Sequence, residues 1–187
     1  MAQGYVYLLP LHTEDWLKLG ISNDPLRRAR EFSRRFHEAF DFDRALLVET
    51  ESQKDAAAIE RRFRKEFAVH RAPMPLTIRL EAGGYTEWYR GAYPSLSTAA
   101  MQLGEAGHRL HQPAREWFKQ ALTSRRNELH DWASEVLRQH GIDPDRPLRD
   151  PLPAAAHSLL SDALDAYRHF GVDVSARLPV ALRGNLS

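Results

Sequence analysis

The feature that most constrains the fold is a pair of short β-forming runs followed at once by a helix start. Residues 4–9 are rich in β-formers, and residues 16–21 alternate apolar and other residues after a polar turn. Asp24 and Pro25 then match a helix N-cap and a first helical position. We therefore expect a hairpin that leads into a helix. The buried stripe of that helix is expected to consist of Leu26, Ala29, Phe32 and Phe36.

Strands and helices continue to alternate after this hairpin. A third strand fits residues 42–49, and Ser52 with Asp55 predicts the start of a helix that ends near residue 68. Residues 76–80 and 86–89 fit two short strands around the Gly83-Gly84 turn. Interleaved helices and strands around one small sheet favour an α/β or α+β domain. We predict an α+β domain over residues 1–94.

The sequence changes character after Pro94. Helices are predicted near residues 97–107, 113–140 and 154–170, with a proline-rich link before the last. Residues 95–187 are therefore expected to form a helical domain, with a loosely held tail after Val172. Its role is open. It would supply target recognition, or the surface for a homodimer or another protein partner.

Composition excludes several kinds of site. The chain has no cysteine, so it has no disulfide framework, thiolate metal site or cysteine nucleophile. No apolar run is long enough to span a bilayer, and no signal-peptide pattern is present at the N-terminus. We expect a cytoplasmic protein that does not bind a membrane.

Basic residues gather in two stretches, although the net charge is only +1. Such stretches could neutralise backbone phosphates, with binding that weakens as salt rises. The alternative is a pair of solvated amphipathic helix faces. The candidate nucleic-acid-binding residues are Arg27, Arg30, Arg34, Arg35, Arg61 and Arg62.

Glu60 is the candidate that helical spacing alone can find. The buried stripe of its helix is expected to consist of Ala56, Ile59, Phe63 and Phe67. Glu60 lies at the edge of this stripe, where a carboxylate needs a metal ion, an arginine or another cation as partner. The alternative is an exposed pair with Arg64, which would contribute only a few tenths of a kcal/mol.

The strand residues Tyr5, Tyr7 and Lys18 are weaker candidates when each is taken alone. The two phenols share a strand face and are suited to proton transfer or phosphate binding, although aromatic residues are also good strand formers. Lys18 shares its face with Gly20, which is expected to leave room for a ligand. His108 and His111 form a His-x-x-His pattern, but no third ligand is evident, so surface histidines are expected.

Five motifs together resemble a known family. They are Gly4-Tyr5-Val6-Tyr7-Leu8-Leu9, then Lys18-Leu19-Gly20-Ile21-Ser22, then Arg28, then Ala57-Ala58-Ile59-Glu60, and last Thr86-Glu87-Trp88-Tyr89. In this order they resemble the GIY-YIG nuclease superfamily. The likeness is to a phage and bacterial branch with a Lys-x-Gly second signature and a Glu-Trp-aromatic ending. It covers about residues 4–91.

The resemblance implies a small domain with a mainly antiparallel sheet flanked by helices, and a metal-dependent endonuclease with DNA as the expected substrate. Glu60 would hold a single Mg²⁺ or Mn²⁺. Tyr7 would accept the proton of the attacking water, directly or through Lys18, whose ammonium would lower the phenol pKa. Arg28 would stabilise the transition state. Supporting roles would fall to Tyr5, Gly20 and Glu87.

The match departs from the family at two points. Lys18 stands where the second signature would begin with tyrosine, and a late asparagine has no counterpart, so Glu87 would take part of its place. Two other interpretations stay open. One is a non-catalytic nucleic-acid-binding module that retains the fold, and the other is a helical interaction protein in which the match is accidental.

Overall fold

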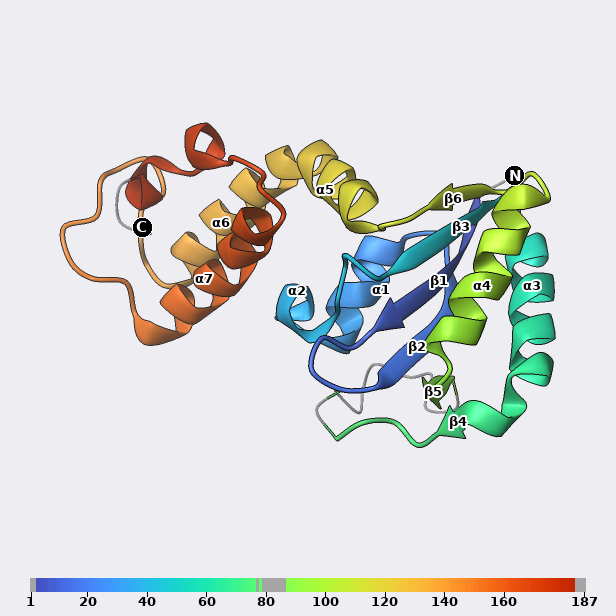
Figure 1. Cartoon of the computed structure of the whole chain (residues 1–187). Coiled ribbons are helices and arrows are strands. Elements are labelled where there is room, and N and C mark those ends of the chain that lie inside the picture. Colours follow the sequence, from blue (N-terminus) through green and yellow to red (C-terminus); the bar gives the residue numbers. More distant parts are fainter. Residues whose placement is uncertain (1–2, 77, 79–86, 184–187) are drawn as a thin grey trace. The chain divides into compact units, whose positions relative to one another are not determined.

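The computed structural model describes residues 3–76, 78 and 87–183. The chain divides into two compact units, Met1–Trp117 and Phe118–Ser187 (Figure 1). Within the described residues, no helix is both long and apolar enough to cross a membrane.

The first unit begins with the predicted hairpin. Strand β1 (Gly4–Pro10) pairs antiparallel with β2 (Trp16–Ser22), in a register that places Tyr7 opposite Gly20. The other edge of β1 pairs with β3 (Leu46–Thr50). This third strand starts later than expected, because residues 41–45 form a turn in which the Ala45 amide donates to the Asp41 carbonyl oxygen at 2.9 Å.

Three further strands complete the sheet. They are β4 (Arg71–Ala72), β5 (Trp88–Arg90) and β6 (Arg109–His111). The order is β4-β5-β2-β1-β3-β6, with every neighbouring pair antiparallel. This architecture confirms the α+β class. The predicted strands at 76–80 and 86–89 are tested only in part, since the Gly83-Gly84 turn and most of residues 77–86 lie outside the described residues.

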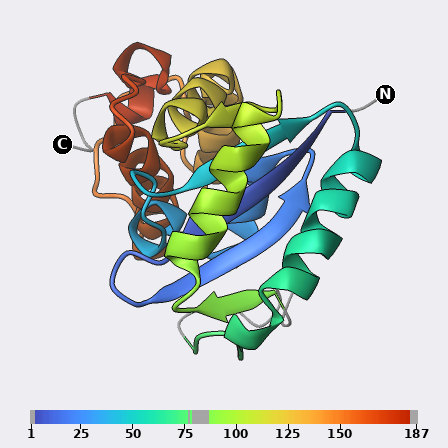
Figure 2. The same ribbon diagram turned by 45° about the vertical axis from the view of Figure 1, so that its right-hand side comes forward.

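Residue parity decides which face of the sheet each side chain occupies. Even positions of β1 and odd positions of β2, such as Val6, Leu8 and Leu19, join a core with α3 (Gln53–Glu66) and α4 (Tyr93–Glu105). Both helices cross this face of the sheet (Figures 1 and 2). Tyr7 and Lys18 therefore point to the opposite face.

The opposite face is covered by α1 (Pro25–Phe32) and the short α2 (Phe36–Ala39). The Asp24 side chain accepts from the Arg27 amide, and Pro25 opens the helix, as predicted. The predicted single helix is broken at residues 33–35. The predicted stripe is nevertheless buried, since exposure is at most 1% for Leu26, Ala29, Phe32 and Phe36.

The start of α3 is fixed by a capping hydroxyl, as the sequence predicts. The Ser52 hydroxyl oxygen accepts from the Asp55 amide at 3.2 Å. Ser52→Ala should therefore lower the free energy of unfolding by about 1 kcal/mol. Urea unfolding measures the change, and Ser95→Ala is a control at a serine that caps no helix. An unchanged free energy for Ser52→Ala would show that the cap contributes nothing.

The first unit extends beyond the expected division at Pro94. Helix α4 buries Leu96, Ala100 and Leu103 in the same core as the sheet, and β6 pairs with β3. The compact units consequently divide after Trp117. The proline at the start of α4 begins a helix of the first unit and does not mark a linker.

The second unit is helical. Helix α5 (Arg115–Ser124) begins in the first unit and ends in the second, and α6 (Arg126–Gln139) and α7 (Ala154–His169) follow. The helix predicted over 113–140 is thus interrupted at Arg125. Phe118 stacks on Phe170 with ring centroids 6.0 Å apart. The helical spacing of Phe118, Leu122, Leu129, Trp132 and Val136 predicts a shared buried face, but Trp132 is 40% exposed.

The segment after Val172 is better packed than expected. Two short helical turns, η3 (Ser175–Arg177) and η4 (Val180–Leu182), follow α7. Val174, Leu178 and Leu182 are buried, so apolar burial holds this segment although it lacks a helical period. The loose tail predicted from the sequence is therefore wrong as far as Leu182, and residues 184–187 lie outside the described residues.

Candidate functional site

Five of the predicted site residues come together in the first unit. We call Tyr7, Lys18, Arg28, Glu60 and Glu87 the polar cluster. They come from β1, β2, α1, α3 and the residue before β5. Direct contacts or electrostatic interactions join each member to others in the set. Residues distant in the sequence therefore share one charged environment.

Tyr7 is held in place by the glycine opposite it. The phenol is 2% exposed, and a Cβ atom at position 20 would lie 2.3 Å from the Tyr7 hydroxyl oxygen and 2.6 Å from its ring. No side chain fits at that distance. The space that Gly20 was predicted to leave for a ligand is filled by the Tyr7 ring, so that expectation is corrected.

Gly20→Ala should therefore displace the Tyr7 ring and lower the free energy of unfolding by about 1–3 kcal/mol. The ring cannot swing away freely, because it is buried and its edge packs on Phe32. Urea unfolding measures the loss. Gly104→Ala is a matched control, because a Cβ there meets Leu110 at an ordinary 3.5 Å. Equal stability of the two variants would contradict the contact between Tyr7 and Gly20.

Arg28 is a cation that hydrogen-bonds to the Tyr7 hydroxyl. Its Nε donates to the Tyr7 hydroxyl oxygen at 3.4 Å, and its Nη1 donates to Glu31 at 2.7 Å. Burial raises the pKa of Tyr7 to about 12, and the hydrogen bond from Arg28 opposes this only in part. The sequence predicted that Lys18 would lower this pKa. In the structure, Arg28 is the cation that lowers the pKa of the phenol, and burial raises that pKa by more than Arg28 lowers it.

Lys18 is fully buried, with an exposed fraction of 0%. Its Nζ atom donates to Glu87 Oε2 at 2.9 Å. Burial lowers the pKa of Lys18, and the hydrogen bond to Glu87 opposes that shift. Glu87 also lies 3.7 Å from Arg64 Nη1. Glu87 therefore links the buried lysine to α3. Its supporting role in the site stays a prediction.

Phe32 is a member of the site that the sequence missed. Its ring lies 4.4 Å from the Arg28 Cζ atom and 5.5 Å from Lys18 Nζ, and it meets the Tyr7 ring edge-on at 6.4 Å. Helical spacing identified Phe32 only as a buried residue. Phe32 lies one helical turn after Arg28, and this spacing could have indicated that both side chains face the same strands.

Glu60 projects from the middle of α3 and is half-buried. Burial raises its pKa, and the charge of Glu87 raises it further, while Arg64 and Lys18 lower it. Among the described residues, Glu60 makes no hydrogen bond or ion pair, whereas Arg64 pairs with Glu87. The exposed pair between Glu60 and Arg64 is therefore not formed, and the carboxylate remains available to a ligand.

The chemistry of these groups fits a hard divalent cation. Glu60 offers carboxylate oxygens beside Glu87, and Mg²⁺ is commonly bound through one or two carboxylates, with water and substrate phosphate as the other ligands. Within the described residues no group of three or more metal-binding side chains is present. A site at Glu60 would therefore take most of its ligands from solvent and substrate.

The six predicted nucleic-acid-binding arginines occupy different environments. Arg27 pairs with Glu31 on α1 at 2.7 Å, and Arg35, which precedes α2, pairs with Glu38 on α2 at 2.6 Å. Five of the six are exposed, and only Arg35 is half-buried; the exposed members are Arg27, Arg30, Arg34, Arg61 and Arg62. All six lie in the first unit, on or beside α1 and α3. Their role in binding stays a prediction.

Tyr5 belongs to a separate group of side chains. It shares the strand face of Tyr7, but its ring packs edge-on against Trp117 at 5.3 Å and lies 6.4 Å from the His111 ring. Burial raises its pKa, and a hydrogen bond with Trp117 opposes the shift. Tyr5 therefore contacts Trp117 and His111 and is not a member of the polar cluster. Its supporting role stays a prediction.

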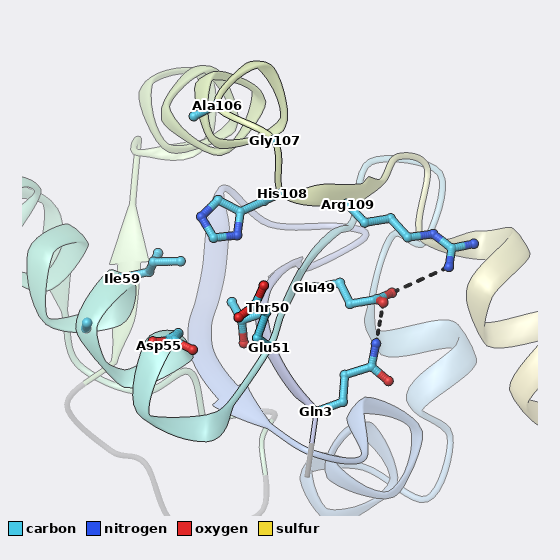
Figure 3. Close-up of a pocket in the computed structure, with 11 residues that line it drawn as sticks. Gln3, Glu49, Thr50, Glu51, Asp55, Ile59, Ala106, Gly107, His108 and Arg109 are labelled. Carbon is cyan, nitrogen blue, oxygen red and sulfur yellow. Dashed lines mark hydrogen bonds and ion pairs between the residues drawn. The ribbon is translucent and has the colours of Figure 1, made fainter. Parts of the chain in front are cut away.

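A pocket of about 840 Å³ lies in the first unit, away from the polar cluster (Figure 3). Its wall includes Glu49, Asp55 and His108, and Glu49 forms an ion pair with Arg109 and a hydrogen bond with His111. None of the polar cluster residues lines it. His108 faces this pocket, while His111 contacts Glu49 at 2.9 Å. The two histidines of the His-x-x-His pattern therefore have different surroundings, His108 at the pocket wall and His111 against Glu49.

Comparison with known proteins identifies a family. The T5orf172 domain model matches residues 4–137, which is more than half of the chain. No curated protein and no solved structure matches this chain. The assignment to the GIY-YIG superfamily is wrong, because the family that matches is a different one. Short signatures at suitable spacing led to that assignment, whereas the family model tests the whole domain. The chain belongs to the T5orf172 domain family.

Proposed function

We propose that this protein is a metal-dependent endonuclease that hydrolyses phosphodiester bonds in nucleic acid, with DNA as the expected substrate. The observation that carries the proposal is the polar cluster. It combines a buried lysine, a buried phenol, an arginine and two carboxylates in one charged environment. Groups of this kind with shifted pKa values are typical of active sites.

The cluster is costly to a fold that has no use for it. Lys18 is fully buried with its charge, and the pKa of Glu60 is raised, so ionised Glu60 is disfavoured where it stands. Apolar side chains of similar volume at these positions would leave the fold equally stable or more stable. Retention of unfavourable charge in one place supports a chemical role for that place.

Each side chain suits one part of phosphodiester hydrolysis. Glu60, with Glu87 beside it, would hold Mg²⁺ or Mn²⁺, which when bound neutralises phosphate charge and helps the leaving group. Tyr7 would take the proton of the attacking water as a phenolate. Arg28 would donate to the phosphate oxygens as negative charge grows on them. Lys18 is held by Glu87 and would offset part of the negative charge of the two carboxylates.

The proposal is tested with wild-type protein and a panel of labelled DNA and RNA substrates, including single strands, duplexes, flaps and junctions. Each is incubated with Mg²⁺, with Mn²⁺ and with excess EDTA. We expect cleavage of at least one substrate that EDTA abolishes and added metal restores. Tight, salt-sensitive binding without cleavage in either metal would instead support the non-catalytic binding module. Cleavage that persists in EDTA would contradict the metal requirement.

A further inference from the structure

A second hollow adjoins the polar cluster in the first unit, at the end of β2. It has a volume of about 410 Å³, and the residues that line it come from three places. They are Ile21 and Ser22 at the end of β2 with Asn23 after it, Arg27, Arg28 and Glu31 on α1, and Gln53 at the start of α3. Arg28 belongs both to this wall and to the polar cluster, where it contacts Tyr7. The hollow is therefore adjacent to the proposed reacting groups.

Helix α3 runs from this hollow to the polar cluster. Gln53, Ala57, Glu60 and Arg64 recur at helical spacing and are all half-buried, so they form one stripe beside the buried stripe of the helix. The rise of an α-helix places Gln53 about 10 Å from Glu60 along its axis. A strand of duplex DNA advances about 3.4 Å per nucleotide, so that separation corresponds to about three nucleotides.

The polar lining of the hollow matches the chemistry of a phosphodiester. Guanidinium groups bind phosphate oxygens in pairs, and amide and hydroxyl groups such as those of Asn23, Gln53 and Ser22 are common phosphate donors. Lining by Asn23 and Gln53 supplies neutral donors that do not depend on pH. The hollow is therefore suited to an anion with several oxygens.

Glu31 occupies the two arginines in this structure. Its Oε1 atom accepts from Arg27 Nη1 at 2.7 Å, and its Oε2 atom accepts from Arg28 Nη1 at 2.7 Å. A carboxylate with one oxygen on each guanidinium engages them as two phosphate oxygens would. The Glu31 side chain is 35% exposed, and that of Arg27 is 62% exposed. Solvent and ligands therefore reach the pair.

We infer that this hollow is a second phosphate subsite, which binds a backbone phosphate a few nucleotides from the bond that is cut. The inference rests on the proposed function, because it takes the polar cluster as the place of cleavage. Glu31 aligns Arg27 and Arg28 when no nucleic acid is present. A phosphate of the substrate takes over those hydrogen bonds on binding. Glu31 thus opposes non-specific binding of anions, and the subsite fixes how the strand lies across the cluster.

Binding to a labelled DNA duplex tests this inference without cleavage, using protein that carries Glu60→Gln. Against that background, Arg27→Gln should weaken binding about tenfold, the effect of one charge-assisted hydrogen bond. It should also reduce the slope of log affinity against log salt concentration by about one, the value expected for one phosphate contact. Glu31→Gln should tighten binding about fivefold, the scale of an exposed ion pair.

Two matched controls separate the subsite from general charge. Lys54→Gln removes a positive charge next to Gln53, at an exposed position outside the hollow. Glu38→Gln removes the carboxylate charge of a similar ion pair, between Glu38 on α2 and Arg35 before that helix. Each control should change affinity by less than the corresponding change at Arg27 or Glu31. Equal effects of control and test variants would overturn the subsite.

Neutral methylphosphonate linkages, placed one at a time along the duplex, locate the contact. We expect one linkage, displaced from the cleavage position, to weaken binding in the parent protein and to have no further effect in Arg27→Gln. Loss of affinity that is additive at every linkage would overturn the inference. Competition by inorganic phosphate distinguishes a site for free anions. If inorganic phosphate displaces the duplex and binds to the parent protein as tightly as the duplex does, the subsite serves a free anion and not a strand.

The outcome is distinguishable from failure of the proposed function. A protein that never cleaves but shows the Arg27, Glu31 and methylphosphonate effects has the phosphate subsite without the nuclease. A protein that cleaves, yet binds and cuts normally with Arg27→Gln and Glu31→Gln, is a nuclease without this subsite. The two claims are therefore tested separately.

Discussion

Cleavage by the wild-type protein is expected to accelerate about tenfold for each pH unit between about pH 6 and pH 9, if the Tyr7 phenolate takes the proton from water. The reason is the pKa of Tyr7, which burial raises to about 12. Throughout this range the phenol is mostly protonated, and the reactive fraction grows tenfold per unit. Initial rates at saturating Mg²⁺, measured across that range, give the slope.

Tyr7→Phe should lower the rate about 10³-fold at pH 8 and flatten this dependence, since proton transfer contributes that order of magnitude. The substitution removes one hydroxyl and keeps the ring against Phe32. Tyr93→Phe is a matched control, because the Tyr93 hydroxyl donates to the Arg44 carbonyl oxygen outside the cluster. If Tyr7→Phe keeps the wild-type slope, another base takes the proton.

Glu60→Gln should abolish metal-dependent cleavage and at the same time raise the melting temperature at pH 7. The pKa of Glu60 is raised in the folded protein, first by burial and then by Glu87. The folded state therefore holds its proton more tightly than the unfolded state, and stability falls as pH rises above about 4.5. At pH 7 the ionised carboxylate destabilises the fold, and glutamine removes that charge.

Thermal unfolding checks this trade between stability and function. The advantage of Glu60→Gln should disappear near pH 4, below both pKa values, where wild-type Glu60 is also uncharged. Added Mn²⁺ should raise the melting temperature of the wild type and leave that of Glu60→Gln unchanged. Glu66→Gln makes the same chemical change at an exposed position of α3 and serves as the control. A lower melting temperature for Glu60→Gln at pH 7 would contradict the assigned environment.

Local signals in the sequence account for much of the fold. Strand alternation predicts the hairpin, and the capping residues Asp24 and Ser52 predict two helix starts, because such signals act within a few residues. Helical spacing also places Glu60 at the margin of a buried stripe, where the structure finds it half-buried. These features depend on neighbours along the chain, and the sequence displays those neighbours directly.

Features that depend on distant residues were missed or misjudged. The contact of Gly20 with Tyr7 requires the hairpin register, and the pairing of Lys18 with Glu87 joins residues 69 positions apart. The change in sequence character after Pro94 suggested a domain boundary, whereas α4 packs on the sheet. Short-range patterns carry no information about such partners.

The candidate site was predicted in part from local signals and was misjudged in part because it depends on distant residues. Tyr7, Lys18, Arg28, Glu60 and Glu87 were all predicted, and the structure brings them together. Their family assignment was wrong, because it rested on five short motifs, while the T5orf172 domain extends to residue 137. The extent of the domain depends on α4, β6 and later residues, which those motifs do not include.

The most direct test of the proposed active site is single-turnover cleavage of one labelled substrate at saturating Mn²⁺. Wild type, Glu60→Gln and Glu66→Gln are compared as folded proteins. The polar cluster predicts that wild type and Glu66→Gln cut at similar rates, while Glu60→Gln yields no product at any metal concentration. Cleavage by Glu60→Gln at the wild-type rate would show that the reaction takes place elsewhere and would contradict the active site proposed for this protein.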